Sequence, residues 1–177
     1  MKTHEITLPV SGVTLHVRRQ PIQVIQQINL RAESIVSERT PKPKPPVQEV
    51  VTGPNETKSI PNQNDPEYVA ELNVWQSLVA VETMNQMMAV LTRVGIVHNN
   101  ALNDYLDDAK DVQESYKDLG YDVPNDLMQF ALQYIIAPAT EDSSTLLYEV
   151  FGRTLPTESQ VAFKRAMFQG NVSESIN

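Results

Sequence analysis

The segment from Asp65 to Ile96 constrains the fold most, because it carries the start and stop signals of one long helix. Asp65 can accept hydrogen bonds from the first free N–H groups, and Pro66 already has the φ angle of a first helical residue. Gly95 lies where a left-handed residue commonly ends a helix. We therefore expect a helix that begins at Pro66, ends near Val94 and is closed by a left-handed Gly95.

The apolar residues of this helix lie on two different sides. At 100° per residue the first group is nearly opposite the second, so the helix is expected to contact two partners. Trp75, the only tryptophan, belongs to the first group and is expected in the core of a helical domain. The first group is Tyr68, Leu72, Trp75 and Val79, and the second is Met84, Met87, Met88, Leu91 and Val94.

The three methionines allow two interpretations. They can pack in the protein's own core, or they can form a soft apolar surface that fits varied partner segments, because methionine is flexible and polarizable. Under the second hypothesis the protein-binding residues are Met84, Met87, Met88 and Leu91. The sequence leaves both interpretations open.

Composition places the chain among globular proteins. It has 177 residues, of which 41% are hydrophobic, and it has no cysteine, which excludes disulfides, thiolate metal sites and cysteine nucleophiles. It contains no apolar run long enough for a membrane span and no signal peptide at the N-terminus, so we expect a soluble, unexported protein that binds no membrane.

The charge is unevenly distributed along the chain. Residues 1–60 carry eight Lys/Arg and five Asp/Glu, whereas residues 61–177 carry six and seventeen, which gives +3 and −11 of the total −8. An acidic surface repels phosphate backbones, so we expect no nucleic-acid partner.

Near the N-terminus, residues 6–17 alternate as a β-hairpin about Ser11-Gly12. The expected pairs are Ile6 with Val17, Leu8 with Leu15 and Val10 with Val13, which places all six apolar side chains on one face and Pro9 on an edge strand. A helix that begins after Pro21 is expected to cover this face with Val24, Ile25, Ile28, Ala32 and Ile35.

Residues 40–64 contain six prolines and are expected to form an extended, semi-rigid linker, in which Val47–Val51 could be a short strand. Further helices are expected at about residues 99–119, 125–136, 142–151 and 157–170, with Asn99 or Asn100 as the cap of the first and Asn125 as the cap of the second. The predicted fold is mainly α, with a hairpin-plus-helix module (1–39), a Pro-rich linker (40–64), a compact multi-helix domain (65–170) and a flexible tail (171–177).

No residue pattern points to catalysis. A ridge of carboxylates on the helix after Asn99 is expected to be a solvated or protein-docking face, since it lacks the turning loop of a calcium site. The ridge consists of Asp104, Asp107, Asp108, Asp111, Glu114 and Asp118. Because the three histidines are scattered and the glycines isolated, we expect no enzyme activity, no metal site and no cofactor.

Two short stretches carry a resemblance to a known family. They are Asn64-Asp65-Pro66-Glu67-Tyr68, and Leu155-Pro156-Thr157-Glu158-Ser159-Gln160-Val161 followed by Phe168-Gln169-Gly170-Asn171-Val172. Together with the β-rich start and the proline-rich linker, they make the chain resemble the tail assembly chaperones of long-tailed bacteriophages.

The resemblance implies a non-catalytic role in virion morphogenesis. Such a chaperone binds the tape measure protein in the cytoplasm of the infected bacterial host and recruits tail tube protein. The alternative is a minor tail or tail-completion protein that stays in the virion tail. Self-association remains open under both readings.

Overall fold

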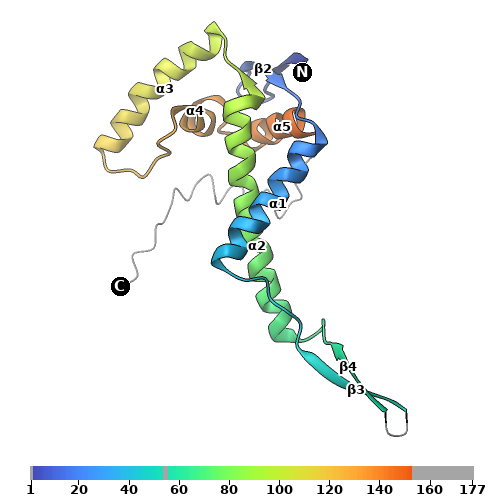
Figure 1. The fold of residues 1–177 in the computed structure, drawn as a ribbon. Helices are drawn as coiled ribbons and strands as arrows, with labels where there is room; N and C mark the ends of the chain where they lie inside the picture. The colour runs from blue at the N-terminus through green and yellow to red at the C-terminus, as the bar shows by residue number, and fades with distance from the viewer. Residues whose placement is uncertain (1, 54–55, 153–177) are drawn as a thin grey trace.

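The computed structural model describes residues 2–53 and 56–152, which form a mainly α fold as predicted (Figure 1). The strands are β1 (Thr3–Thr7), β2 (Thr14–Arg18), β3 (Val47–Gly53), β4 (Glu56–Pro61) and β5 (Ile96–Val97). The helices are α1 (Ile22–Arg39), α2 (Pro66–Val90), α3 (Asn100–Asp118), α4 (Leu127–Ala131) and α5 (Thr140–Phe151). Two π-helical turns, η1 (Leu91–Gly95) and η2 (Leu132–Ile136), extend α2 and α4.

The long helix begins as its sequence predicts and ends differently. The Asp65 carboxylate accepts hydrogen bonds from the N–H groups of Glu67 at 3.1 Å and Tyr68 at 3.0 Å. The expectation of a left-handed Gly95 is wrong, because its φ is not positive and the chain runs directly into β5. A Cβ at Gly95 would lie 3.0 Å from a Val150 methyl carbon, so glycine here allows the end of α2 to approach α5 closely.

The N-terminal hairpin forms with a register two residues away from the predicted one. Ile6 lies opposite Leu15 rather than Val17, and Thr7 lies opposite Thr14. The cause is a longer loop, in which the Gly12 N–H donates to the Leu8 carbonyl at 3.0 Å and Gly12 has a φ of 70°. A shift of two preserves the faces, but the longer loop leaves the Val10 side chain exposed.

This hairpin is part of the main core and not a separate module. The sheet order is β1-β2-β5, so β1 is an edge strand as predicted, while β5 from the end of α2 pairs with β2. Leu8, Leu15 and Val17 are buried in one cluster with side chains of α2, α4 and α5. The predicted boundary between a module at 1–39 and a domain at 65–170 is therefore wrong.

The helix α1 packs mainly along α2. Its buried residues are Ile25, Ile28, Ala32 and Val36, and the predicted Ile35 is only half-buried. The strand β2 instead packs against α5, where the Gln20 N–H donates to the Val150 carbonyl. The cover of the hairpin thus comes from the far end of the chain, which local periodicity does not reveal.

Residues 40–64 form more structure than a linker. Residues 41–46 have no regular secondary structure, but β3 and β4 pair antiparallel, with Gln48 opposite Ile60 and Val51 opposite Thr57. The Asn62 N–H donates to the Pro46 carbonyl at 2.7 Å and closes the base of this ribbon. The ribbon lies at the opposite end of α2 from β2, α4 and α5 (Figure 1).

The remaining helices follow their predicted caps closely. Asn99 caps α3 by accepting from the Leu102 N–H at 2.8 Å, and Asp126, one residue after the expected Asn125, caps α4. The α5 helix ends at Gly152 with a φ of 68°. The helix predicted at 157–170 and the tail at 171–177 lie outside the described residues.

Candidate protein-interaction surface

The four residues of the methionine hypothesis lie in the core. Met84, Met87, Met88 and Leu91 are 2, 5, 8 and 2% exposed and belong to the cluster that includes β2 and α5. The hypothesis that they form a client-binding surface is therefore wrong for this structure. The physical reason is that η1 and β5 fold the end of α2 against the sheet and α5, which cover this side of the helix.

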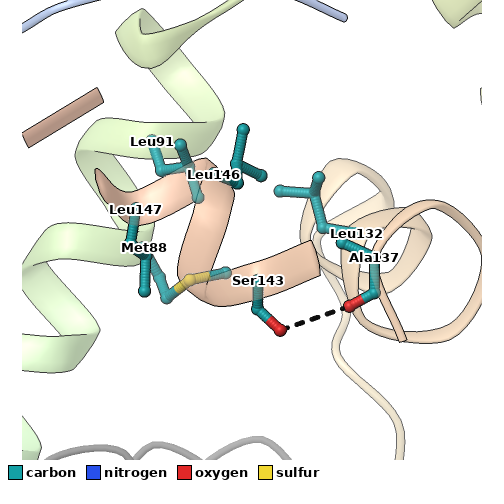
Figure 2. A pocket seen from close by; sticks show the side chains of 7 residues that line it. All are labelled: Met88, Leu91, Leu132, Ala137, Ser143, Leu146 and Leu147. Atoms are coloured by element: carbon teal, nitrogen blue, oxygen red, sulfur yellow. Dashed lines mark hydrogen bonds between the residues drawn. The ribbon is translucent and has the colours of Figure 1, made fainter. Parts of the chain in front are cut away.

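The space beside these residues is too small for a ligand. Figure 2 shows the side chains of Met88, Leu91, Leu132, Ala137, Ser143, Leu146 and Leu147 around it, and its volume is about 10 Å³. That is at the lower limit for one water molecule. Among the described residues that line it, Ser143 is the one with a polar side chain, and its hydroxyl lies 2.8 Å from the Ala139 carbonyl oxygen and 3.4 Å from that of Ala137. We interpret this space as a packing gap.

Trp75 is buried, as predicted, but not in the main core. It is 4% exposed, its indole N–H donates to the Thr40 carbonyl at 3.1 Å, and the Lys42 ammonium lies 4.9 Å from its ring centroid. These contacts join the end of α1 to α2. The main core cluster contains no residue between 29 and 83, and we call residues 29–83 the arm and the other described residues the head.

The arm exposes a row of apolar side chains on α2. Val74, Leu78 and Val81 are 61, 42 and 39% exposed, and the small Ala70 is exposed beside them. At 100° per residue this α2 stripe is centred about 135° from the side that packs on α1. Its spacing of four, four and three residues is that of a helix seam that packs on another helix.

The charged side chains that α2 itself carries all have one sign. Residues 59–92 contain four carboxylates and no Lys or Arg. Glu71 lies along one flank of the stripe and Glu67 lies at its N-terminal end, seven residues before Val74 and so on nearly the same line, whereas Asn73 and Ser77 on the other flank are neutral. The stripe is therefore an apolar seam with an acidic border.

The ribbon exposes further apolar side chains. Val47 and Val51 lie on one face, with Val51 76% exposed, and Ile60 lies on the other. An isolated two-stranded ribbon also leaves backbone N–H and C=O groups unpaired along both outer edges. Such an edge can accept an additional strand from a partner.

The polar features of the head give weaker evidence for a binding site than the arm does. The carboxylate ridge on α3 is exposed, as predicted for a solvated face, and no group of three or more potential ligands in residues 2–53 and 56–152 is placed to hold a metal ion. His4 lies 3.0 Å from Glu149 and His16 lies 3.5 Å from Glu5. A polar depression of about 300 Å³ borders Arg93, Asp126 and Gln129 but has no buried unpaired group directed into it.

Comparison with family models, curated proteins and solved structures found no match for this chain. No helix in the described part of the chain is long and apolar enough to cross a membrane. The candidate interaction surface is therefore identified from the structure alone, by the exposed residues of the arm.

Proposed function

We propose that this protein is a tail assembly chaperone of a long-tailed bacteriophage, which binds the tape measure protein and recruits tail tube protein without catalysing a reaction. The observation that carries the proposal is the arm, which holds exposed apolar side chains on both α2 and the ribbon outside the main core. Apolar surface of this kind is characteristic of protein-binding sites. The identity of the client is taken from the family resemblance that the two sequence stretches carry.

In this proposal the client binds the arm and not the methionines, which are buried. A chaperone must hold an apolar segment that would otherwise aggregate, and then release it. Exposed side chains on a projecting element suit this task, because they are accessible without opening the core. The proposed location is the cytoplasm of the infected host.

The ribbon favours a second candidate, a minor tail or tail-completion protein that remains in the virion. Its open strand edges could pair permanently with a strand of another tail protein. The two candidates differ in where the protein is found after assembly.

Two measurements test the proposal. Co-expression with the tape measure protein of the same genome should keep that protein soluble, and the Val74→Asp/Val81→Asp variant should not. Leu30→Asp, at an exposed apolar position of α1, is the matched control and should behave as the unmodified chain.

Mass spectrometry of purified particles then separates the candidates. A chaperone should be absent from mature virions, and a tail-completion protein should be present. An insoluble tape measure protein in the presence of the unmodified chain would overturn the chaperone proposal.

A further inference from the structure

We infer that the α2 stripe is a docking site for a basic amphipathic helix of a partner protein. The inference rests on the proposed function, because it names the kind of client segment that the arm holds. It is carried by the apolar seam of Ala70, Val74, Leu78 and Val81 together with the acidic border beside it.

The geometry fits a helix rather than a strand or a small molecule. The stripe runs from Ala70 to Val81 along one helix face, which corresponds to about 17 Å at 1.5 Å per residue. Apolar residues repeated at three and four positions interlock with the same repeat on a second helix. The stripe lies along one face of a helix, and the ridges of side chains on one helix pack into the grooves of another.

The charge selects the partner. Glu67 and Glu71 border the seam, and α2 itself carries no Lys or Arg. The nearby Lys42 lies over Trp75, toward the side of α2 that packs on α1. A partner helix with Lys or Arg along one flank gains ion pairs with these carboxylates, while an acidic helix is repelled. A second copy of this chain offers no basic residue on its own α2 stripe and is therefore the poorer occupant.

The test uses two synthetic helical peptides of about 20 residues that share one leucine seam and differ only in the flanking charge, with Lys in one and Glu in the other. Fluorescence anisotropy with the full chain should show that the Lys peptide binds about tenfold more tightly, and that added salt reduces the difference. Glu67→Lys/Glu71→Lys should reverse the preference. Val74→Asp/Val81→Asp should weaken binding of the Lys peptide by about tenfold or more.

Two controls separate the stripe from general attraction to an acidic protein. Asp107→Asn/Asp111→Asn neutralises part of the exposed α3 ridge, and Leu30→Asp changes an exposed apolar residue elsewhere on the arm. Both should bind the Lys peptide within about twofold of the unmodified chain. Circular dichroism should show nearly unchanged melting for the aspartate and asparagine variants, since every changed side chain is exposed. A small decrease is expected for Glu67→Lys/Glu71→Lys, because Glu67 lies in the first turn of α2, where a negative charge is favoured. If one aspartate variant melts early, the charge-reversal pair decides.

Three results would overturn the inference. They are equal binding of the two peptides, a loss with the α3 variant as large as that with the Glu67/Glu71 variant, and a dimer in sedimentation that Val74→Asp/Val81→Asp dissociates. Because no phage protein is used, the two proposals fail separately. If the tape measure protein stays soluble but the two peptides bind equally, the chaperone proposal stands and the helix-docking inference fails. If the tape measure protein is insoluble but the Lys peptide is preferred, the inference stands and the chaperone proposal fails.

Discussion

At the residue scale, Asp142 joins the loop of the N-terminal hairpin to the first turn of α5. Its side chain is fully buried, and its two carboxylate oxygens accept hydrogen bonds from the N–H groups of Val10 at 2.7 Å and Ser11 at 2.8 Å. Both bonds have a charged acceptor, which makes them stronger than neutral ones. One side chain therefore fixes a loop more than a hundred positions away.

Replacing Asp142 with alanine should lower the free energy of unfolding by about 2 kcal/mol or more, because two N–H groups lose a charged acceptor. Asp142→Asn should cost less, since the amide oxygen can still accept one bond while its NH₂ group faces the other donor. Urea unfolding followed by circular dichroism measures both. Equal stability of the alanine variant and the unmodified chain would contradict this role.

Trp75 is the residue that joins α1 to α2 in the arm. Trp75→Ala should lower the free energy of unfolding of the arm by about 3–5 kcal/mol, as for other buried aromatic residues. Trp75→Phe should cost less, because it keeps an aromatic ring in the site, although it loses the hydrogen bond to Thr40 and weakens the contact with Lys42. In the unmodified chain the fluorescence maximum should be blue-shifted from that of indole in water; a fully water-like spectrum would disprove the burial.

At the scale of the element, α2 is one helix with two environments. Residues 66–83 have one side against α1 and expose the α2 stripe, whereas residues 84–90 bury Met84, Met87 and Met88 in the head. The helix therefore has no uniform amphipathic pattern. Apolar side chains are exposed in one part of it and buried in the other.

This difference predicts two outcomes for matched pairs of substitutions. Met87→Ser/Met88→Ser should lower the free energy of unfolding by about 4 kcal/mol or more, because buried apolar groups are lost and hydroxyls are left in the core. Val74→Ser/Val81→Ser on the same helix should change it by less than about 1 kcal/mol. Thermal melting of the two variants compares them directly; similar losses would mean that the α2 stripe is covered.

Local signals predicted most of the helices, and long-range pairing escaped prediction. The cap at Asp65 is correct, and Asn99 is one of the two caps predicted for α3, because an N-cap depends on residues within one turn. The β5 strand, the cover by α5 and the role of Asp142 depend on contacts between distant segments, which periodicity does not encode.

The candidate site was missed for a related reason. The methionines and the α2 stripe are both apolar at helical spacing, and only the tertiary structure shows which of the two is exposed. The uneven distribution of carboxylates was visible in the sequence, because three of the four in residues 59–92 precede Val74, and it would have distinguished the start of the helix from its end.

The ribbon is the element most open to proteolysis. Because Lys42 and Lys44 precede prolines, which block trypsin, Lys58 in β4 is the accessible tryptic site of residues 40–64. An isolated two-stranded ribbon opens readily, so within residues 2–152 trypsin should cut first after Lys58. Lys58→Gln should remove this cut. Earlier cleavage after Arg93, at the end of η1, would show that the head is the less stable part.

At the scale of the whole molecule, the head contains the main core and the arm projects from it (Figure 1). Because Pro46 and Asn62 are hydrogen-bonded neighbours, a short Asn-Gly turn can replace residues 47–61 without moving the chain ends. This deletion should leave the melting temperature of the head nearly unchanged, since no ribbon residue belongs to its core. A drop as large as that of Met87→Ser/Met88→Ser would mean that the ribbon stabilises the head.

The bond between Asp142 and the hairpin loop also orders events during synthesis. Val10 and Ser11 leave the ribosome 132 and 131 residues before the carboxylate that binds them. At about 5–20 residues per second, the hairpin loop waits on the order of ten seconds for its acceptor. Within that interval α1 and α2 are completed and can pair before α5 emerges. We therefore expect the arm to form before the head has closed, with its apolar seam already available.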